Sequence, residues 1–324
     1  MKAQVIRIFG EPENMTFEEV ETPVLGPGQV LVEVHGAGVN FADILMCQGK
    51  YQDTPQLPFT PGMEISGFVK EVGLGAEGVY PGDKVMAKVA SGGFGENVVV
   101  DVHNCWLAPA GLSMAQIAAF PIAYGTSHLA LTKRAKLQKG EVLLVHGAAG
   151  GVGLTAVEIG KALGATVIAT AGNAEKLALA KSHGADYGIN YTCENIRDKV
   201  KEMTGRVDVV FDPVGGDVFM QSLRCMNAEG RMIVVGFAAG DIQQIPSNHL
   251  LVKNVDVLGF YWGGYAKFMP EIYKKSYRDL SQMVAQGDLK PHISHEIPLK
   301  DAPKALALLA SRKSTGKVVI KVRD

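Results

Sequence analysis

The stretch His146-Gly147-Ala148-Ala149-Gly150-Gly151-Val152-Gly153 decides the fold class of this chain. It joins an apolar run, residues 141–146, to a helical pattern in which Val152, Ala156 and Ile159 share one face and Gly164 marks the end. Alone, such a glycine pattern is a common tight turn. Between a buried strand and a helix it is typical of a dinucleotide site, because glycines let the backbone approach a pyrophosphate and the free N–H groups of the helix N-terminus favour its charge.

Strand and helix patterns alternate strictly after residue 140. Repeated units of this kind require a parallel sheet covered by helices on both faces, with right-handed crossovers. We therefore expect an α/β domain with a doubly wound parallel sheet. The expected strands are 141–146, 166–170, 207–211 and 231–236, and the helices between them are 152–163, 174–183 and 218–226.

The first 120 residues show a different pattern, which predicts a β-rich domain. Residues 29–35 alternate, with Val30, Val32 and Val34 on one face. Frequent glycine and proline turns bound further short strands, such as 67–72 and 84–89.

The tail is too short to be a domain by itself, so we expect it to rejoin the first one. It contains helical patterns near 272–286 and 302–311 and a strand at 317–322. The predicted domains are a β-rich domain, residues 1–122 with 264–324, and a dinucleotide-binding domain, residues 123–263.

The end of the second expected strand indicates which dinucleotide binds. NAD sites place an Asp or Glu about 20 residues beyond the glycine loop, where it binds the ribose 2′-hydroxyl. Here the sequence is Thr170-Ala171-Gly172-Asn173, and Lys176 follows at the start of the next helix. Without a carboxylate to repel a 2′-phosphate, the site favours NADPH. The alternative for Lys176 is an ordinary solvated helix lysine beside Glu175.

The amino-acid composition further restricts the class of protein to which this chain can belong. The 324 residues are 47% hydrophobic and 20% charged with a formal charge of −1, which argues against disorder and against a nucleic-acid partner. No apolar stretch reaches the ~18 residues that a membrane helix needs. The start, residues 1–6, is expected to form a strand rather than a leader, and four widely spaced cysteines suit a reducing compartment. We therefore expect a cytoplasmic protein.

Three further segments, together with the glycine loop, carry a family resemblance: residues 39–43 (VNFAD), 57–64 (LPFTPGME) and 312–318 (RKSTGKV). From end to end the chain is similar to the zinc-independent quinone oxidoreductases of the medium-chain dehydrogenase/reductase superfamily. Residues 215–219, 236–238 and 261–263 most resemble the quinone oxidoreductase-like subgroup. The resemblance implies a GroES-like β domain, a central Rossmann domain and a tail that rejoins the first domain.

Departures from the zinc-dependent relatives at both of their zinc sites predict that this chain holds no metal. Those alcohol dehydrogenases have a catalytic Cys where this chain has Asn40 and a His where it has Met63, and their loop of four cysteines is represented by Cys105 alone. Zinc sites need three or four protein ligands. His292 and His295 form a lone H-x-x-H pair, which is typical of a surface loop.

The resemblance also assigns residues to the cofactor, position by position. Gly150 to Gly153 would meet the pyrophosphate, and Gly172, Lys176 and Tyr191 would bind the 2′-phosphate. The full set assigned to the cofactor is Asn40, Thr126, Gly150, Gly151, Val152, Gly153, Gly172, Lys176, Tyr191, Val214, Gly215, Gly236, Phe237, Ala238, Ala239, Tyr261 and Arg312.

For catalysis, Asn40 and Tyr51 are the candidate hydrogen-bond donors to a substrate oxygen. Their alternatives are a turn asparagine and an interface aromatic. A second tyrosine that some relatives carry is Phe59 here. Asp43 is as well explained by helix capping as by chemistry. Tyr261 and its neighbour Trp262 would either wall the pocket or pack in the core.

The favoured function is hydride transfer from NADPH to a quinone or an α,β-unsaturated carbonyl. The alternatives are an enoyl-thioester reductase, which would need a basic patch for its carrier, and an NADPH-binding protein with little turnover. By analogy, an edge strand at 255–260 would pair with its copy in a homodimer.

Overall fold

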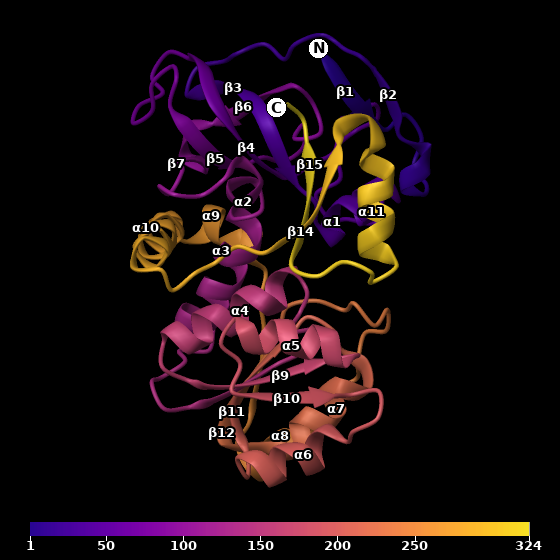
Figure 1. Cartoon of the computed structure of the whole chain (residues 1–324), viewed down its shortest axis with the longest axis vertical. Coiled ribbons are helices and arrows are strands. Elements are labelled where there is room, and N and C mark those ends of the chain that lie inside the picture. The colour runs from indigo at the N-terminus through magenta and orange to yellow at the C-terminus, as the bar shows by residue number, and fades with distance from the viewer. Residues whose placement is uncertain (324) are drawn as a thin grey trace. The chain divides into compact units, whose positions relative to one another are not determined.

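The computed structural model describes residues 1–323, which form two compact units. The first comprises residues 1–122 and 291–323, and the second comprises Ala123–Lys290. Figure 1 shows the elements of both.

In the described part of the first unit, a seven-stranded sheet has the order β14-β15-β3-β4-β5-β7, with β6 also paired to β3. The predicted alternation in β3 is seen, since Val30, Val32 and Val34 are all fully buried. Strand β15 pairs antiparallel with β3, so the tail rejoins this sheet. The strands are β1 (Lys2–Val5), β2 (Thr16–Glu19), β3 (Gln29–Gly38), β4 (Glu64–Val72), β5 (Lys84–Lys88), β6 (Asn97–Asp101), β7 (Cys105–Leu107), β14 (Ile293–Pro298) and β15 (Lys317–Lys321), and the helices are α1 (Phe41–Cys47), α2 (Met114–Ala118) and α11 (Ala302–Ala310).

The second unit, described throughout, is built on a six-stranded parallel sheet of order β10-β9-β8-β11-β12-β13. The strands are β8 (Val142–Val145), β9 (Thr166–Ala171), β10 (Tyr187–Asn190), β11 (Val207–Asp212), β12 (Met226–Val234) and β13 (Asp256–Gly259). The helices are α3 (Pro121–Leu129), which starts in the first unit, α4 (Gly151–Ala162), α5 (Ala174–Ser182), α6 (Ile196–Met203), α7 (Gly216–Cys225), α8 (Ser247–Lys253), α9 (Trp262–Phe268) and α10 (Pro270–Gln286).

Helices cover both faces of this sheet, which confirms the predicted doubly wound α/β class. On one face, α4 packs so closely that a Cβ on Gly160 would lie 2.4 Å from Leu143 Cδ2. On the other, Leu144 and Ile168 share a core with α6 and α7. The chain runs from β8 outward to β10 and then crosses to β11 on the other side of β8. The carboxyl ends of β8 and β11 therefore mark the switch point where ligands bind in open α/β sheets.

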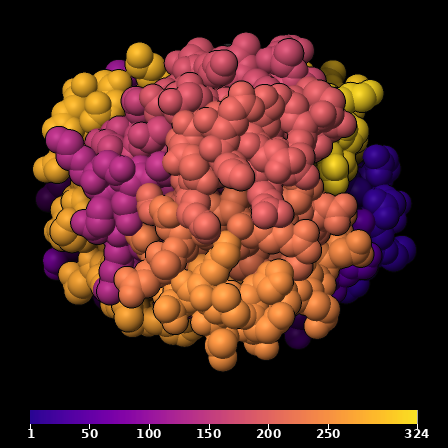
Figure 2. All heavy atoms as spheres, turned by 90° about the horizontal axis from the view of Figure 1, so that it is seen from below, coloured from indigo at the N-terminus to yellow at the C-terminus, as the bar shows by residue number. Residues whose placement is uncertain are grey.

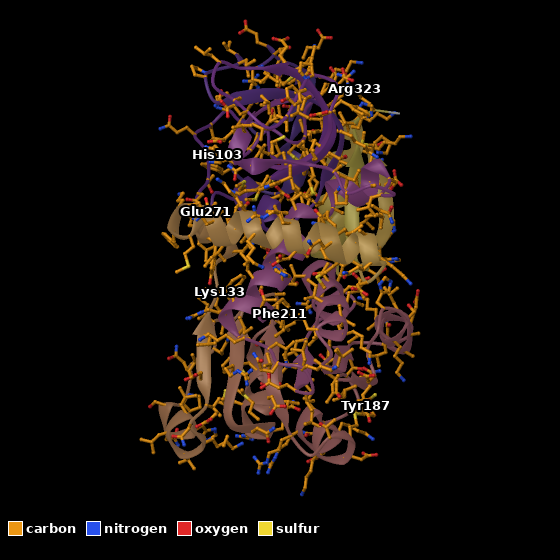
Figure 3. All side chains as sticks on the ribbon, turned by 90° about the vertical axis from the view of Figure 1, so that its left-hand side faces the viewer. His103, Lys133, Tyr187, Phe211, Glu271 and Arg323 are labelled. Atoms are coloured by element: carbon orange, nitrogen blue, oxygen red, sulfur yellow. The ribbon has the colours of Figure 1, made fainter. Side chains whose placement is uncertain are left out.

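Strand β10 and helix α6, which connects it to β11, are among the elements absent from the sequence prediction. Strand β10 has one fully buried apolar side chain, Ile189, while Tyr187, which is labelled in Figure 3, is 38% exposed. Helix α6 buries only Ile196 and Val200. Their apolar patterns are too short to separate from a loop.

Residues 264–290, which the sequence pattern places with the β-rich domain, lie in the second compact unit. Helix α10 is held there by aromatic packing, because Tyr273 contacts Trp262 with ring centroids 5.3 Å apart. His128 Nδ1 of α3 also bonds Ser276 Oγ at 2.8 Å.

The cysteines form no disulfide: Cys47, Cys105 and Cys225 are buried and Cys193 is exposed. Among the described residues, no helix has the length and apolar character needed to cross a membrane.

Candidate functional site

The glycine loop between β8 and α4 has the geometry of a phosphate cradle. Gly147 has a φ of +56°, in the left-handed region that glycine favours. A Cβ on Gly153 would lie 2.1 Å from the carbonyl oxygen of Gly147, so only glycine fits there. Gly150 is the N-cap of α4 and has no side chain to cap it. The N–H groups of the first helical turn are thus available to an anion.

A second loop, between β9 and α5, lies beside it in the sheet. Asn173 Oδ1 accepts a hydrogen bond from Lys176 N at 2.8 Å, so Asn173 caps α5 and Lys176 stands in its first turn. A Cβ on Gly172 would lie 3.1 Å from Tyr191 Oη. The backbone N–H of Tyr191 also donates to Ala171 O. Gly172 and Tyr191 therefore lie close together at the turn that leads into Lys176, and the common role of the three residues toward a 2′-phosphate stays a prediction.

Two more loops complete this edge of the sheet. After β11, Asp212 Oδ1 accepts from Val214 N at 2.8 Å and from Gly215 N at 2.9 Å. After β12, Ala238 N donates to Pro213 O and Ala239 N donates to Val214 O at 2.8 Å.

The loop after β11 meets the glycine loop, because a Cβ on Gly147 would lie 3.4 Å from Val214 Cγ2. The loop after β12 is joined to it through Pro213 and Val214. Asp212 is a residue that the sequence reasoning missed. The sequence does contain a signal for Asp212, because an acidic residue at the end of a predicted strand stands directly before Pro-Val-Gly-Gly.

The remaining predicted residues of this unit occupy different environments. Thr126 is 7% exposed on α3, and the next residue, Ser127, donates to Val152 O in the first turn of α4. Tyr261 is the N-cap of α9 beyond β13 and is 45% exposed. Trp262 is 7% exposed, with its ring over Gly125. The core interpretation thus fits Trp262 better than the pocket-wall interpretation.

In the first unit, Asn40 belongs to a buried polar cluster with Glu64 and Lys317. Asn40 Nδ2 donates to Glu64 Oε1 at 2.9 Å, and Lys317 Nζ donates to Asn40 Oδ1 at 2.7 Å. Lys317 Nζ also donates to Glu64 Oε1 and Val39 O. Both ends of the Asn40 amide are therefore engaged inside the protein. This geometry favours Asn40 as a fixed structural group over the predicted donor to substrate.

Asp43 lies beside this cluster and is fully buried. Its Oδ2 accepts from Asn40 N at 2.8 Å, which supports the capping interpretation. Burial raises the pKa of Asp43 to about 7, with Glu64 adding to the rise, while the bond from Asn40 and the charge of Lys317 oppose it. Lys317 bonds Glu64 directly, whereas it acts on Asp43 through its charge. A proton on Asp43 therefore relieves its repulsion from Glu64.

Tyr51 and Arg312 also lie in the first unit. Tyr51 is partly buried against its core, and its carbonyl accepts from Thr54 Oγ1 at 2.7 Å. Arg312 is exposed, with a φ of +57° just after α11. Phe59 is 8% exposed and packs in the core. The roles of Tyr51 and Arg312 toward substrate and cofactor stay predictions.

The residues at the positions of the relatives' zinc ligands do not fit a catalytic zinc. Asn40 is held by Lys317 and Glu64, and Met63 is a buried thioether in the apolar core. Within residues 1–323, no group of three or more His, Cys, Asp or Glu side chains is arranged to hold a metal ion.

Two units define the medium-chain dehydrogenase/reductase architecture. One is a β-rich unit whose sheet includes the tail of the chain, and the other is a Rossmann unit with a glycine cradle at its switch point. Models of two families match, the alcohol dehydrogenase GroES-like domain over residues 26–110 and the zinc-binding dehydrogenase over residues 151–283.

Comparison with individual proteins narrows this class. The chain is 42% identical to quinone oxidoreductase-like protein 2 of Mus musculus, over 96% of this chain and 90% of that one. It is 44% identical to a Nematostella vectensis homolog of that protein, over 95% of this chain and 85% of that one. The Escherichia coli quinone oxidoreductase solved with NADPH superposes with a TM-score of 0.91 at 31% identity, covering 99% and 100% of the two chains. The chain belongs to the quinone oxidoreductase family of this superfamily.

Proposed function

We propose that this protein is an NADPH-dependent, zinc-independent reductase that delivers a hydride to a quinone or an α,β-unsaturated carbonyl. The observation that carries the proposal is the series of contacts that links the loops at the carboxyl ends of β9, β8, β11 and β12, with the glycine cradle at the β8 end. Structures of similar proteins, from Escherichia coli and Thermus thermophilus, were solved with NADPH.

The preference for NADPH over NADH rests on the turn after β9. That turn has no acidic residue, and its Asn173 is already used as a helix cap. The Lys176 ammonium and the Tyr191 hydroxyl are the charge-assisted and neutral donors proposed for a 2′-phosphate. A carboxylate at this turn would instead repel the phosphate.

The proposed substrate class follows from the chemistry of the donors. Asn40 and Met63 provide no Lewis acid to polarise a simple carbonyl. A bound nicotinamide would supply the hydride. A quinone or enone accepts a hydride at a conjugated carbon, so the negative charge appears on a remote oxygen, and a single hydrogen-bond donor helps to stabilise it. Tyr51 is the proposed donor. Arg312, Thr126 and Tyr261 are proposed cofactor contacts.

We also propose that two copies form a homodimer through β13. This strand pairs only with β12 in the described structure, so its other edge is open. The neighbouring helix α8 exposes Leu251 (78%) and Val252 (77%). Both elements belong to the second unit, whose residues are coloured magenta to orange in Figure 2.

Stopped-flow oxidation of NADPH against a panel of quinones, enones and enoyl-CoA esters tests the reaction. Rapid turnover with quinones or enones supports the proposal. Preference for enoyl-CoA esters would instead identify a thioester reductase. Tight NADPH binding without turnover on the whole panel would identify a binding protein.

A further inference from the structure

His146 is the first residue after β8, at the base of the glycine loop, and it is completely buried. Burial lowers the pKa of this imidazole, while the charge of Asp212 opposes that effect, so His146 is neutral at physiological pH. Neither ring nitrogen can contact a bound cofactor directly, because both already bond side chains within the unit.

The proton positions on His146 follow from its two partners. Ser222 Oγ donates its single proton to Val218 O at 2.7 Å. The same oxygen lies 2.7 Å from His146 Nε2, so while Ser222 donates to Val218 O it accepts from this nitrogen. A neutral imidazole protonated at Nε2 has an acceptor at Nδ1, which lies 2.9 Å from Thr170 Oγ1. Three bonds therefore run in one direction, from Thr170 through His146 and Ser222 to Val218.

This relay connects the loops of the cofactor site. Thr170 stands two residues before Gly172, in the strand that leads to the proposed 2′-phosphate turn. Ser222 belongs to α7, the helix that begins at Gly216. Backbone hydrogen bonds also join the start of the glycine loop to the neighbouring strands. His146 N donates to Phe211 O of β11 (Phe211 is labelled in Figure 3), and Ala148 N donates to Thr170 O of β9.

We propose that His146 is a positioning residue, which through Thr170 fixes the distance between the pyrophosphate cradle and the 2′-phosphate turn and so contributes to the preference for NADPH. This inference rests on the proposed function, because it requires that the site binds NADPH. NADH lacks the 2′-phosphate and does not depend on that distance. The Thr170 bond therefore affects the ratio of the two affinities, whereas the Ser222 bond affects both affinities alike.

The test measures Kd values for NADPH and NADH by nicotinamide fluorescence, with the full-length protein. Thr170→Val removes only the hydroxyl and is expected to weaken NADPH binding about three- to tenfold, the range for one hydrogen bond, with NADH changed less than about twofold. Thr170→Ser keeps the hydroxyl and should retain the wild-type ratio. Ser222→Ala should weaken both cofactors by a similar factor.

Two histidine replacements separate the halves of the relay. In His146→Asn the side-chain amide can take the place of Nδ1, so the ratio of affinities should be retained. In His146→Gln it can take the place of Nε2, so the preference for NADPH should fall as in Thr170→Val. The matched control is Ser276→Ala, which removes a buried bond to another histidine of the same unit, His128. This control should lower the melting temperature without changing the ratio.

If the wild-type protein does not bind NADPH, the proposed function is wrong. If the wild-type protein prefers NADPH but Thr170→Val changes both Kd values equally, only the positioning role is wrong. A folded His146→Gln variant that keeps the wild-type ratio of NADPH to NADH affinity would also contradict the positioning role of His146.

Discussion

Lys317 Nζ lies 2.7 Å from Asn40 Oδ1 and 2.7 Å from Glu64 Oε1, and the lysine is only 7% exposed. With Val39 O as a third acceptor, all three N–H bonds of the ammonium are used. The last strand of the chain is thereby joined to the start of α1. The cluster also fixes the Asn40 amide, whose oxygen must face the lysine and whose nitrogen must face the glutamate.

The first prediction concerns the stability of this cluster. Lys317→Met leaves Glu64 without its buried counter-charge, so we expect the free energy of unfolding to fall by about 3–5 kcal/mol, the usual cost of breaking a buried pair. Urea unfolding at pH 7 measures it. Lys321→Met, on the exposed side of the same strand, is the control and should change stability by less than about 1 kcal/mol. Equal losses of unfolding free energy in the two variants would show that the buried cluster contributes no more to stability than an exposed lysine does.

The second prediction concerns pH. The folded pKa of Asp43 is about 7, well above its unfolded value, so the folded state retains a proton that the unfolded state releases. The stabilising contribution of Asp43 is therefore complete below its unfolded pKa, ~3.9, and is lost as the pH rises toward 7. Asp43→Asn should remove this dependence. The difference in unfolding free energy between wild type and variant, measured from pH 5 to 7.5, should decline with pH; a constant difference would contradict the prediction.

The sequence predicts the parts of the site that depend on local patterns. The glycine loop and the Thr170 to Lys176 turn each lie within one strand–turn–helix unit, where spacing alone indicates the backbone geometry. It does not reveal that Asn40 is engaged, because the residue that binds its oxygen is 277 positions away. The His146 relay is hidden for the same reason, since Ser222 is 76 positions away and its approach depends on the sheet order.

The third prediction tests the cofactor preference directly. Lys176→Ala removes a charge-assisted bond to a 2′-phosphate, so NADPH affinity should fall about 10- to 100-fold while NADH affinity stays nearly constant. Fluorescence titration with both cofactors gives the ratio. Lys181→Ala, an exposed lysine in the last turn of the same helix, controls for loss of general positive charge. A Lys176→Ala variant that keeps its full preference for NADPH would show that this lysine is an ordinary solvated residue.

The fourth prediction concerns metal. Elemental analysis of the purified protein should find no stoichiometric zinc, and chelators should change neither turnover nor melting temperature, because Asn40 and Met63 cannot replace a thiolate and an imidazole as ligands. About one zinc per chain, lost together with activity, would contradict the assignment of this chain to the zinc-independent members.

The last prediction concerns Tyr51, whose phenol is the proposed donor to the substrate oxygen. A donor that acts on developing charge affects turnover more than cofactor binding, because its bond strengthens in the transition state. A quinone accepts a hydride more readily than an enone and should need this help less.

Tyr51→Phe should therefore lower the single-turnover rate with enones by up to about 100-fold, the order of magnitude found when such donors are removed, and lower the rate with quinones much less. Its Kd for NADPH should stay unchanged. Tyr80→Phe, at a tyrosine that is 71% exposed in the same unit, is the matched control and should leave both rates unaltered. If Tyr51→Phe reduces every enone at the wild-type rate, Tyr51 only lines the pocket and the proton comes from solvent, because Phe59 stands where some relatives carry a second tyrosine.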